Sequence, residues 1–512
     1  MGHFLKNLSY SKLIYLRQSS QSRPHAHRGA AMNGHFLREV NAGKGQIMKR
    51  DRSSKKEKRA KRHTTSKNNN EEELVFEDPF VDEFEEEDVQ EDSKTNVADD
   101  DADEDPRIET WDPMERPLEE GETLNYDSTA YKMFHTLRPE WPSLSFDILK
   151  DNLGAKRTKF PLTAFMVTGT QADRADKNKL TVMKVSELHK TEHDEDSDAD
   201  DDEMALDDDP VLESVEASHP GCTNRIRAMP QNSNVVATWA DTGRVHIWDI
   251  SEAIQKLSSK GGSSGRSWRP VPVFTFEGHP CEGYAMSWSS RKKGHLLTGD
   301  CRHHIYHWEP TGGSTWSIDK IPFKGHKDSV EDLQWSPSED TVFASCSVDK
   351  TVRIWDTRCK KRPMLTCSDA HDTDVNVIAW NRLVEYLIVS GSDDGSFKIW
   401  DLRNFKSQSP AAHFQWHTQP ITSVSWHPDD DSVLAVSSAD STISIWDMSV
   451  EADGDEAEMD FGDGARRKVP PQMLFLHQGC KDPKELHFHP QLPGVIVSTG
   501  SEGYNLFRPC NL

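Results

Sequence analysis

The chain has 512 residues, a formal net charge of −25 at pH 7 and a hydrophobic content of 34%. That content is below the roughly 45–50% of a typical globular domain, and no apolar run reaches the roughly 18 residues of a membrane-spanning helix. We therefore expect no membrane partner. The eight cysteines include no Cys-x-x-Cys pair, which disfavours a disulfide framework or a zinc site and favours reduced thiols.

Residues 1–120 are predicted to form a disordered tail, basic over residues 1–62 and acidic over residues 71–105. No acidic residue precedes Glu39, a composition that a mitochondrial transit peptide shares with a disordered basic tail. We favour the tail, because segment 49–62 has nine Lys or Arg in fourteen residues and is typical of a nuclear import signal. The residues assigned to this signal are Lys55, Lys56, Lys58, Arg59, Lys61 and Arg62.

Residues 121–141 are predicted to form one amphipathic helix before the first repeat. Asp127 or Ser128 can cap its start, and Pro139 ends it. The apolar residues that recur at helical spacing are Tyr126, Ala130, Phe134 and Leu137.

Three segments of alternating, strand-like sequence follow, at residues 142–149, 163–169 and 180–188. The first of them is the candidate strand for closing a ring of sheets. Residues 194–209 then hold eleven Asp or Glu among sixteen residues, so this run cannot build a core. We interpret it as an anionic loop between the first and second blades. Within it, Ser197 is a predicted phosphorylation site for an acidophilic kinase.

From about residue 212 the chain repeats itself. Each unit has an early His and ends in Trp-Asp, or in a close variant of it, and three successive intervals between the terminal Trp residues are 47, 45 and 46 residues. This pattern is typical of WD-repeat β-propeller blades. The final aromatic residues of the six units are Trp248, Trp308, Trp355, Trp400, Trp446 and Phe507.

The six units and the upstream strands together predict an all-β fold, a seven-bladed WD-repeat β-propeller over residues 142–512. It is expected to carry acidic insertions at residues 192–209 and 451–463. Within the best-matching unit, a hydrogen-bonded network is expected to join four side chains. They are His326, Ser345, Asp349 and Trp355.

The sequence offers no nucleophile–base pair, no Gly-rich phosphate loop and no metal-ligand spacing. The recurring His residues occupy repeat positions, so we interpret them as structural. We therefore expect no catalytic activity, no cofactor and no metal site.

A narrower resemblance rests on "YKMFHTLRPEWPSLSFDIL" (131–149), the WD repeats and the acidic segments. Over roughly residues 108–512 the chain resembles the glutamate-rich WD-repeat protein family of ribosome biogenesis, which is related to the histone-binding WD-repeat proteins of chromatin assembly complexes. The resemblance implies a monomeric nuclear and nucleolar protein. It would chaperone a basic large-subunit ribosomal protein and bind histones.

In the histone-binding relatives, the N-terminal helix and an acidic loop hold a histone helix. By position, this implies client contacts on the helix at Tyr126, Tyr131, Phe134 and Leu137. It implies acidic contacts at Asp194, Glu195, Asp196, Asp198, Asp200, Asp201, Asp202, Glu203, Asp207, Asp208 and Asp209. Clustered carboxylates of this kind compete with nucleic acid for basic proteins.

Two alternatives stay open. "WDTR" and "WDLR" match the Trp-Asp-x-Arg pattern of substrate receptors that bind a cullin ubiquitin-ligase adaptor, with Arg358 and Arg403 as the contacts. A histone-binding component of chromatin complexes is the other. Direct sequence-specific nucleic-acid binding is disfavoured by the net charge of −25.

Overall fold

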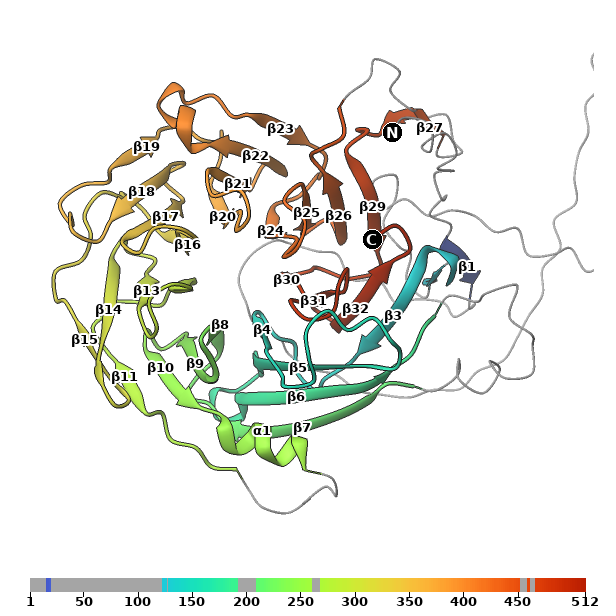
Figure 1. Cartoon of the computed structure of the whole chain (residues 1–512), viewed down its shortest axis with the longest axis horizontal. Helices are drawn as coiled ribbons and strands as arrows, with labels where there is room; N and C mark the ends of the chain where they lie inside the picture. The colour runs from blue at the N-terminus through green and yellow to red at the C-terminus, as the bar shows by residue number, and fades with distance from the viewer. Residues whose placement is uncertain are drawn as a thin grey trace, which may run out of the picture. The chain divides into compact units, whose positions relative to one another are not determined.

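The computed structural model describes residues 15–19, 122–126, 128–191, 209–259, 268–451, 458–460 and 466–512. Seven four-stranded antiparallel sheets are arranged in a ring (Figure 1). The innermost strand of each sheet lies beside that of the next, around a central channel. The predicted seven-bladed propeller is confirmed.

We number the blades in chain order. Blade 1 contains β4 (Phe146–Leu149), β5 (Leu162–Gly169), β6 (Lys179–Leu188) and β7 (Val211–Ser218). Blade 2 contains β8 (Thr223–Met229), β9 (Asn232–Ala240), β10 (Val245–Asp249) and β11 (Phe274–Phe276). Blade 3 contains β12 (Ala285–Trp288), β13 (Leu296–Gly299), β14 (Ile305–Gly312) and β15 (Thr315–Ile318). Blade 4 contains β16 (Val330–Trp335), β17 (Val342–Ser347), β18 (Val352–Asp356) and β19 (Leu365–Cys367).

The last three blades follow the same pattern. Blade 5 contains β20 (Val375–Trp380), β21 (Leu387–Ser392), β22 (Ser396–Asp401) and β23 (Ala412–Gln415). Blade 6 contains β24 (Ile421–Trp426), β25 (Val433–Ser438), β26 (Thr442–Asp447) and β29 (Met473–Gln478). Blade 7 contains β30 (Glu485–Phe488), β31 (Ile496–Gly500), β32 (Gly503–Pro509) and, at its outer edge, β3 (Tyr131–Leu137).

Smaller elements lie outside the blades. Two antiparallel strand pairs are β1 (Tyr15–Ser19) with β2 (Glu122–Tyr126), and β27 (Glu458–Asp460) with β28 (Arg466–Lys468). The helical elements are α1 (Ser251–Ser258) and the 3-10 turns η1 (Ser128–Ala130), η2 (Ala175–Lys177) and η3 (Leu402–Ser407). In the described part of the chain, no helix is long and apolar enough to cross a membrane.

The helix predicted over residues 121–141 is wrong. Residues 131–137 form β3, which pairs antiparallel with β32 from Tyr131 opposite Pro509 to Leu137 opposite Tyr504. Without β3, the edge of β32 would expose unpaired backbone N–H and C=O groups. The backbone hydrogen bonds gained by closing the sheet therefore outweigh a helical spacing of apolar residues that was only a weak preference.

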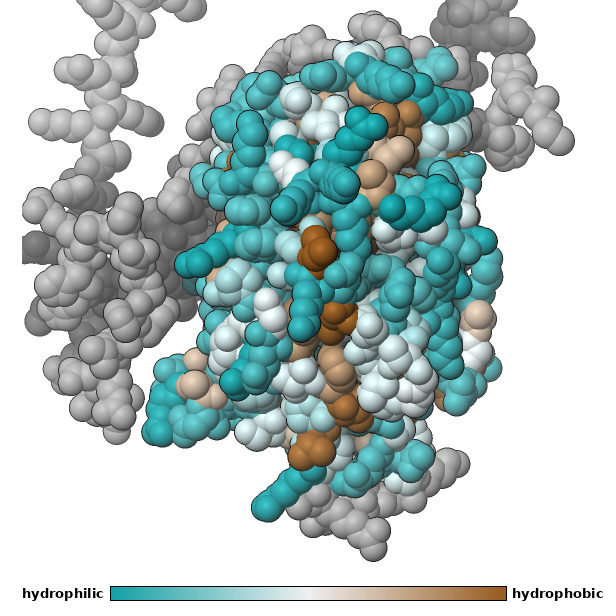
Figure 2. All heavy atoms as spheres, turned by 90° about the vertical axis from the view of Figure 1, so that its left-hand side faces the viewer, coloured by the Kyte–Doolittle hydropathy of each residue, from teal (hydrophilic) through white to brown (hydrophobic). Residues whose placement is uncertain are grey.

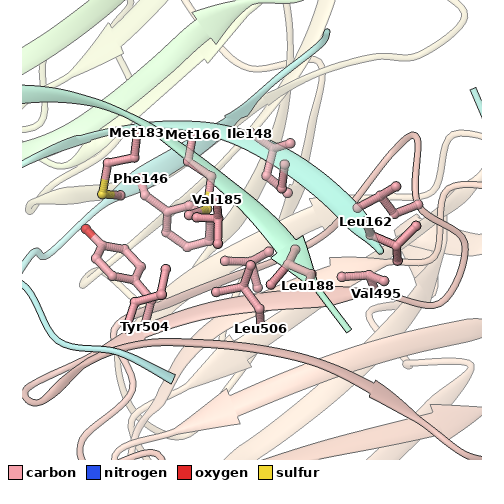
Figure 3. Packing of buried hydrophobic residues seen from close by; sticks show 14 of the residues in the cluster. Phe146, Ile148, Leu162, Met166, Met183, Val185, Leu188, Val495, Tyr504 and Leu506 are labelled. Carbon is pink, nitrogen blue, oxygen red and sulfur yellow. The ribbon is translucent and has the colours of Figure 1, made fainter. Parts of the chain in front are cut away.

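The closing strand was also assigned to the wrong segment. Residues 142–149 were the candidate, but they contain β4, the innermost strand of blade 1. An apolar seam joins this strand and its neighbours to blade 7 (Figure 3). Side chains of blade 1, including Met166 and Val185, pack there against Tyr504 and Leu506 of blade 7. The ring is therefore closed both by backbone pairing and by a shared core.

The predicted network of blade 4 is present in the structure. The Nε2 atom of His326 lies 2.6 Å from the Ser345 hydroxyl, to which the Trp355 indole N–H donates at 2.7 Å. The other ring nitrogen of His326 lies 3.0 Å from a carboxylate oxygen of Asp349. These buried polar groups satisfy one another, so removing one of them would leave a partner unpaired.

Two blades build the same network from different residues. In blade 6, Ser444 on the third strand contacts both His417 and Trp446, where blade 4 uses a serine of the second strand. In blade 7, the ring of His477 lies between the hydroxyl of Tyr131, at 2.8 Å, and the side-chain amide of Asn505. The closing strand thus supplies a member of the last blade's internal network.

The outer side of the ring that carries β15 and β19 faces the viewer in Figure 2. Hydrophilic residues cover most of this side, and hydrophobic residues form a narrow band. Beside these two strands, Ile321 and Met364 are 61% and 54% exposed. The larger candidate binding surfaces described below are charged.

Gly503 tests ring closure. A Cβ atom at this position would lie 2.1 Å from the backbone oxygen of Leu137 on β3, at a φ of +129°. Gly154 is a matched control, because its φ is +107° and nothing lies within 4 Å of its Cβ position. We expect both Gly→Ala variants to lose about 1–3 kcal/mol through backbone strain, and Gly503→Ala to lose at least about 1 kcal/mol more through the clash. Urea unfolding measures the difference, and equal losses would contradict the proposed role of β3.

Candidate protein-binding surface

The outer edge of β3 is bordered by the segment that leads into the first acidic insertion. The N–H of Thr191 donates to the Lys132 carbonyl at 3.0 Å, and the N–H of Phe134 donates to the Thr191 hydroxyl at 2.9 Å. The Nε2 atom of His135 lies 2.9 Å from the His189 carbonyl oxygen. The acidic insertion therefore starts directly beside the closing strand.

The four client-contact residues inferred on this segment differ in exposure. Tyr131 and Leu137 are only 1% and 5% exposed, so they belong to the core of blade 7 and do not form a binding surface. Tyr126 and Phe134 are half-buried and pack edge to face with ring centroids 4.8 Å apart. The alternation of Tyr131 and Met133 was the sequence signal for a strand, and it was missed because the helical spacing was preferred.

The first acidic insertion lies within blade 1, not between blades 1 and 2 as the sequence suggested. It connects β6 to β7, which pair out to Ser186 opposite Val211. Residues 194–208, including Ser197, lie outside the described residues. Asp209 is described, and it lies close enough to His135 to oppose the lowering of that residue's pKa, which is caused mainly by burial. The ends of the insertion are thus held together next to β3.

The second acidic insertion occupies the equivalent place in blade 6. Residues 451–463 fall between β26 and β29, again the third and fourth strands of a blade. Residues 452–457 and 461–463 lie outside the described residues. Because strand direction alternates within each blade, every connection from a third to a fourth strand opens on the same face of the ring. The two insertions therefore flank blade 7 on one face.

A second acidic cluster lies on the opposite face, at the mouth of the channel, and sequence reasoning missed it. Burial raises the pKa of Asp374, and the neighbouring charge of Asp393 raises it further. Burial likewise raises the pKa of Glu331, with Asp374 adding to the effect. The pKa of Tyr284 rises to about 12 through burial and then the charge of Glu282. Carboxylates crowded in this way favour a positively charged group beside them.

These acidic residues escaped notice because each stands alone in its own repeat unit. The signal was positional, since equivalent residues of successive repeats converge at the channel. The residues found five positions after the early His of four units are Tyr284, Glu331, Asn376 and Thr422.

An ion network beneath this mouth fixes the innermost strands of three blades. Glu485 of blade 7 receives hydrogen bonds from the guanidinium groups of Arg225 and Arg227 on β8, and from the N–H of Phe146 on β4. Burial opposes ionisation of Glu485, but the two arginines hold its pKa well below the usual value. The network therefore fixes the channel wall beneath the acidic mouth.

The two arginines of the Trp-Asp-x-Arg motifs lie at the ends of third strands, on the face that carries the acidic insertions. The side chain of Arg358 is 76% exposed and binds the Asp356 carboxylate. Arg403 is 65% exposed, binds Asp401, and its guanidinium lies 3.7 Å from the centre of the Tyr386 ring. Both guanidinium groups are thus positioned by their neighbours and remain accessible.

The predicted import-signal residues Lys55, Lys56, Lys58, Arg59, Lys61 and Arg62 lie outside the described residues.

The channel mouth yields a stability prediction. The raised pKa of Asp374 means that its ionised form is disfavoured in the folded state, so folding stability is lost as pH rises through the unfolded and then the folded pKa. At pH 7, Asp374→Asn should therefore raise the free energy of unfolding, by a few tenths of a kcal/mol after solvent screening. Urea unfolding at low salt measures this. Asp430→Asn, at an exposed position, is the control, and destabilisation by Asp374→Asn would contradict the crowding.

The ring of seven blades and the recurring His–Ser/Thr–Trp networks define a WD-repeat β-propeller protein. The family model "WD domain, G-beta repeat" matches residues 318–356, 362–401 and 408–447. A second family model, which describes the "Histone-binding protein RBBP4" and a component of the CAF1 complex, matches residues 121–189. These residues contain β3 and most of blade 1.

Three relatives align with most of the chain. "Glutamate-rich WD repeat-containing protein 1" of Dictyostelium discoideum is 46% identical, over 80% of this chain and 87% of the relative. "Ribosome assembly protein rrb1" of Schizosaccharomyces pombe is 42% identical, over 85% and 92%. "Protein HEAT STRESS TOLERANT DWD 1" of Arabidopsis thaliana is 46% identical, over 81% and 94%. The chain belongs to the glutamate-rich WD-repeat protein family, as the sequence resemblance predicted.

Proposed function

We propose that this protein is a non-enzymatic chaperone of a basic client, a large-subunit ribosomal protein that it accompanies during ribosome assembly in the nucleus and nucleolus. We include histones among its ligands. The 42% identity to a protein named for ribosome assembly supports the pathway. The match of residues 121–189 to a histone-binding family model supports recognition of very basic proteins.

The observation that carries the proposal is the crowding of carboxylates at the channel mouth. Asp374, Asp393 and Glu331 raise one another's cost of ionisation, and this cost falls when a Lys or Arg side chain of a client lies among them. The ring fixes these residues beforehand, so a client does not have to order them. We assign this mouth as the specific contact for the client.

The acidic insertions have a different role in the proposal. They open on the other face, beside blade 7, and residues 194–209 carry eleven acidic side chains. Long-range attraction from such a run speeds the capture of a basic partner more than it fixes its pose. Phosphorylation of Ser197 would add negative charge to the same run. Half-buried Tyr126 and Phe134, close to its base, offer the aromatic contact surface.

The central experiment is a pull-down of the full chain from nuclease-treated extract, with bound proteins identified by mass spectrometry. Enrichment of one large-subunit ribosomal protein supports the proposal. Recovery of core histones alone would favour a role in chromatin complexes instead. Nuclease treatment matters because basic proteins can otherwise be recovered through shared nucleic acid.

The charge of the first insertion can be tested separately from its length. Residues 194–208 are replaced by a Gly-Ser segment of equal length, and residues 260–267, an insertion at the same place in blade 2, are replaced in the control. Polylysine is the probe, with association followed by stopped flow. We expect the first replacement to slow association at low salt at least about tenfold and the control to leave it unchanged. An unchanged rate in both variants, or unfolding of the first, would contradict the assignment.

A second candidate function is favoured by the exposed, positioned guanidinium groups of Arg358 and Arg403. We propose that they form a docking point for a cullin-ligase adaptor. Both follow the third strands of adjacent blades, so a single partner can contact the two together.

The double variant Arg358→Ala/Arg403→Ala tests this docking point. Its control is Arg362→Ala/Arg382→Ala, which removes two exposed arginines of the same blades. We expect the first variant to lose at least about tenfold in adaptor co-purification, because buried contacts to Arg are worth about 2 kcal/mol or more at interface centres. Equal recovery of adaptor with both variants would exclude these residues as the contact.

A further inference from the structure

Two histidines and a glutamate that are not part of the repeat networks meet at the border of blades 3 and 4. His295 precedes β13, while His307 and Glu309 lie on β14. In the register of these strands Leu297 is opposite His307 and Leu296 is opposite Trp308, so His295 comes opposite Glu309. Because side chains alternate along a strand, all three project from the same side of the sheet.

The three donors are close together. The Nδ1 atom of His295 lies 3.0 Å from the Nε2 atom of His307, and a carboxylate oxygen of Glu309 lies 3.6 Å from the other ring nitrogen of His307. One ligand atom from each residue lies within 4.8 Å of the other two. Two imidazole nitrogens bound to one tetrahedral Zn²⁺ at about 2.0–2.1 Å would be about 3.4 Å apart. A shift of a few tenths of an ångström would therefore admit the ion.

The surroundings hold part of this arrangement in place and leave part of it open. The ring of His307 is 7% exposed and packs edge to face against Trp335 of blade 4, so its orientation is fixed. His295 is half-buried and Glu309 is exposed, which leaves one side of the cluster open to solvent. Lys360 carries a nearby positive charge that would oppose a cation, but it is paired with Asp319 at 2.7 Å.

We propose that His295, His307 and Glu309 form a binding site for a divalent transition-metal ion of the Zn²⁺ class, with its fourth position open to water or to a partner's side chain. Two imidazoles and a carboxylate are a ligand set that zinc accepts, with three protein ligands and one exchangeable position. The set is less suited to Mg²⁺ or Ca²⁺, which prefer oxygen ligands only.

Binding requires a modest rearrangement of protons. In the metal-free protein the two rings share one hydrogen bond, so one of the two facing nitrogens carries the proton. On binding, that proton moves to the ring nitrogen that faces away, and both facing lone pairs then coordinate the ion. The carboxylate supplies the third bond without losing a proton, because it is already ionised at neutral pH.

The test is a calorimetric titration of Zn²⁺ into the chelator-treated full chain at pH 7.5, with excess Mg²⁺ present to occupy oxygen-only sites. His295→Gln and Glu309→Gln change residues that are not fully buried and should leave the fold intact, whereas His307 is packed between two blades. His303→Asn is the control, because it removes an exposed histidine of the same blade at a φ of 65° that Asn tolerates.

We expect one Zn²⁺ per chain in the wild type and in His303→Asn. His295→Gln and Glu309→Gln should each weaken that binding at least tenfold, while their melting temperatures without metal stay unchanged. If both variants bind Zn²⁺ like the wild type, the site is overturned and the contact between the rings is only a hydrogen bond. If Glu309→Gln alone binds like the wild type, the three-ligand site is overturned as well.

Discussion

The backbone pairing between β3 and β32 is the constraint on which the rest of the structure depends. Blade 7 has only three strands from the C-terminal part of the chain, and Tyr131–Leu137 completes it. The same pairing places Tyr131 beside His477 and brings the base of the first acidic insertion against the outer edge of the ring. Closure of the fold and placement of the proposed capture surface thus arise from one set of backbone hydrogen bonds.

The ring separates structural polar groups from those free to bind. Histidines inside the blades, such as His326 and His417, are held between a hydroxyl and a carboxylate, and they leave no capacity for a ligand. The acidic residues at the channel mouth have the opposite character. Asp374 and Glu331 are crowded by like charge at a cost to stability. Such a cost is commonly retained where a protein must bind.

The sequence predicted the blade number and the composition of the repeat network, because Trp355 and its equivalents recur at a nearly fixed period. It did not predict β3, since the preference of residues 131–137 is weak and is decided by a strand more than 350 residues away in the chain. It also failed to show the channel mouth, because Asp374 and Glu331 are brought together only by the ring. Local patterns identified the blades, whereas contacts between distant segments decided the closing strand and the acidic mouth.

Closure from both ends of the sequence has a consequence for the synthesis of the protein. Tyr504 contacts Ser143 across 361 intervening positions, so the contact order is high at this point of the ring. Until β32 has been synthesised, the growing chain has an unfinished sheet whose edge can pair with other nascent chains. The acidic run that follows β6 is made early and carries strong negative charge, which repels a second copy of the same chain. A segment proposed to attract basic clients would then also protect its own protein from aggregation while it is being made.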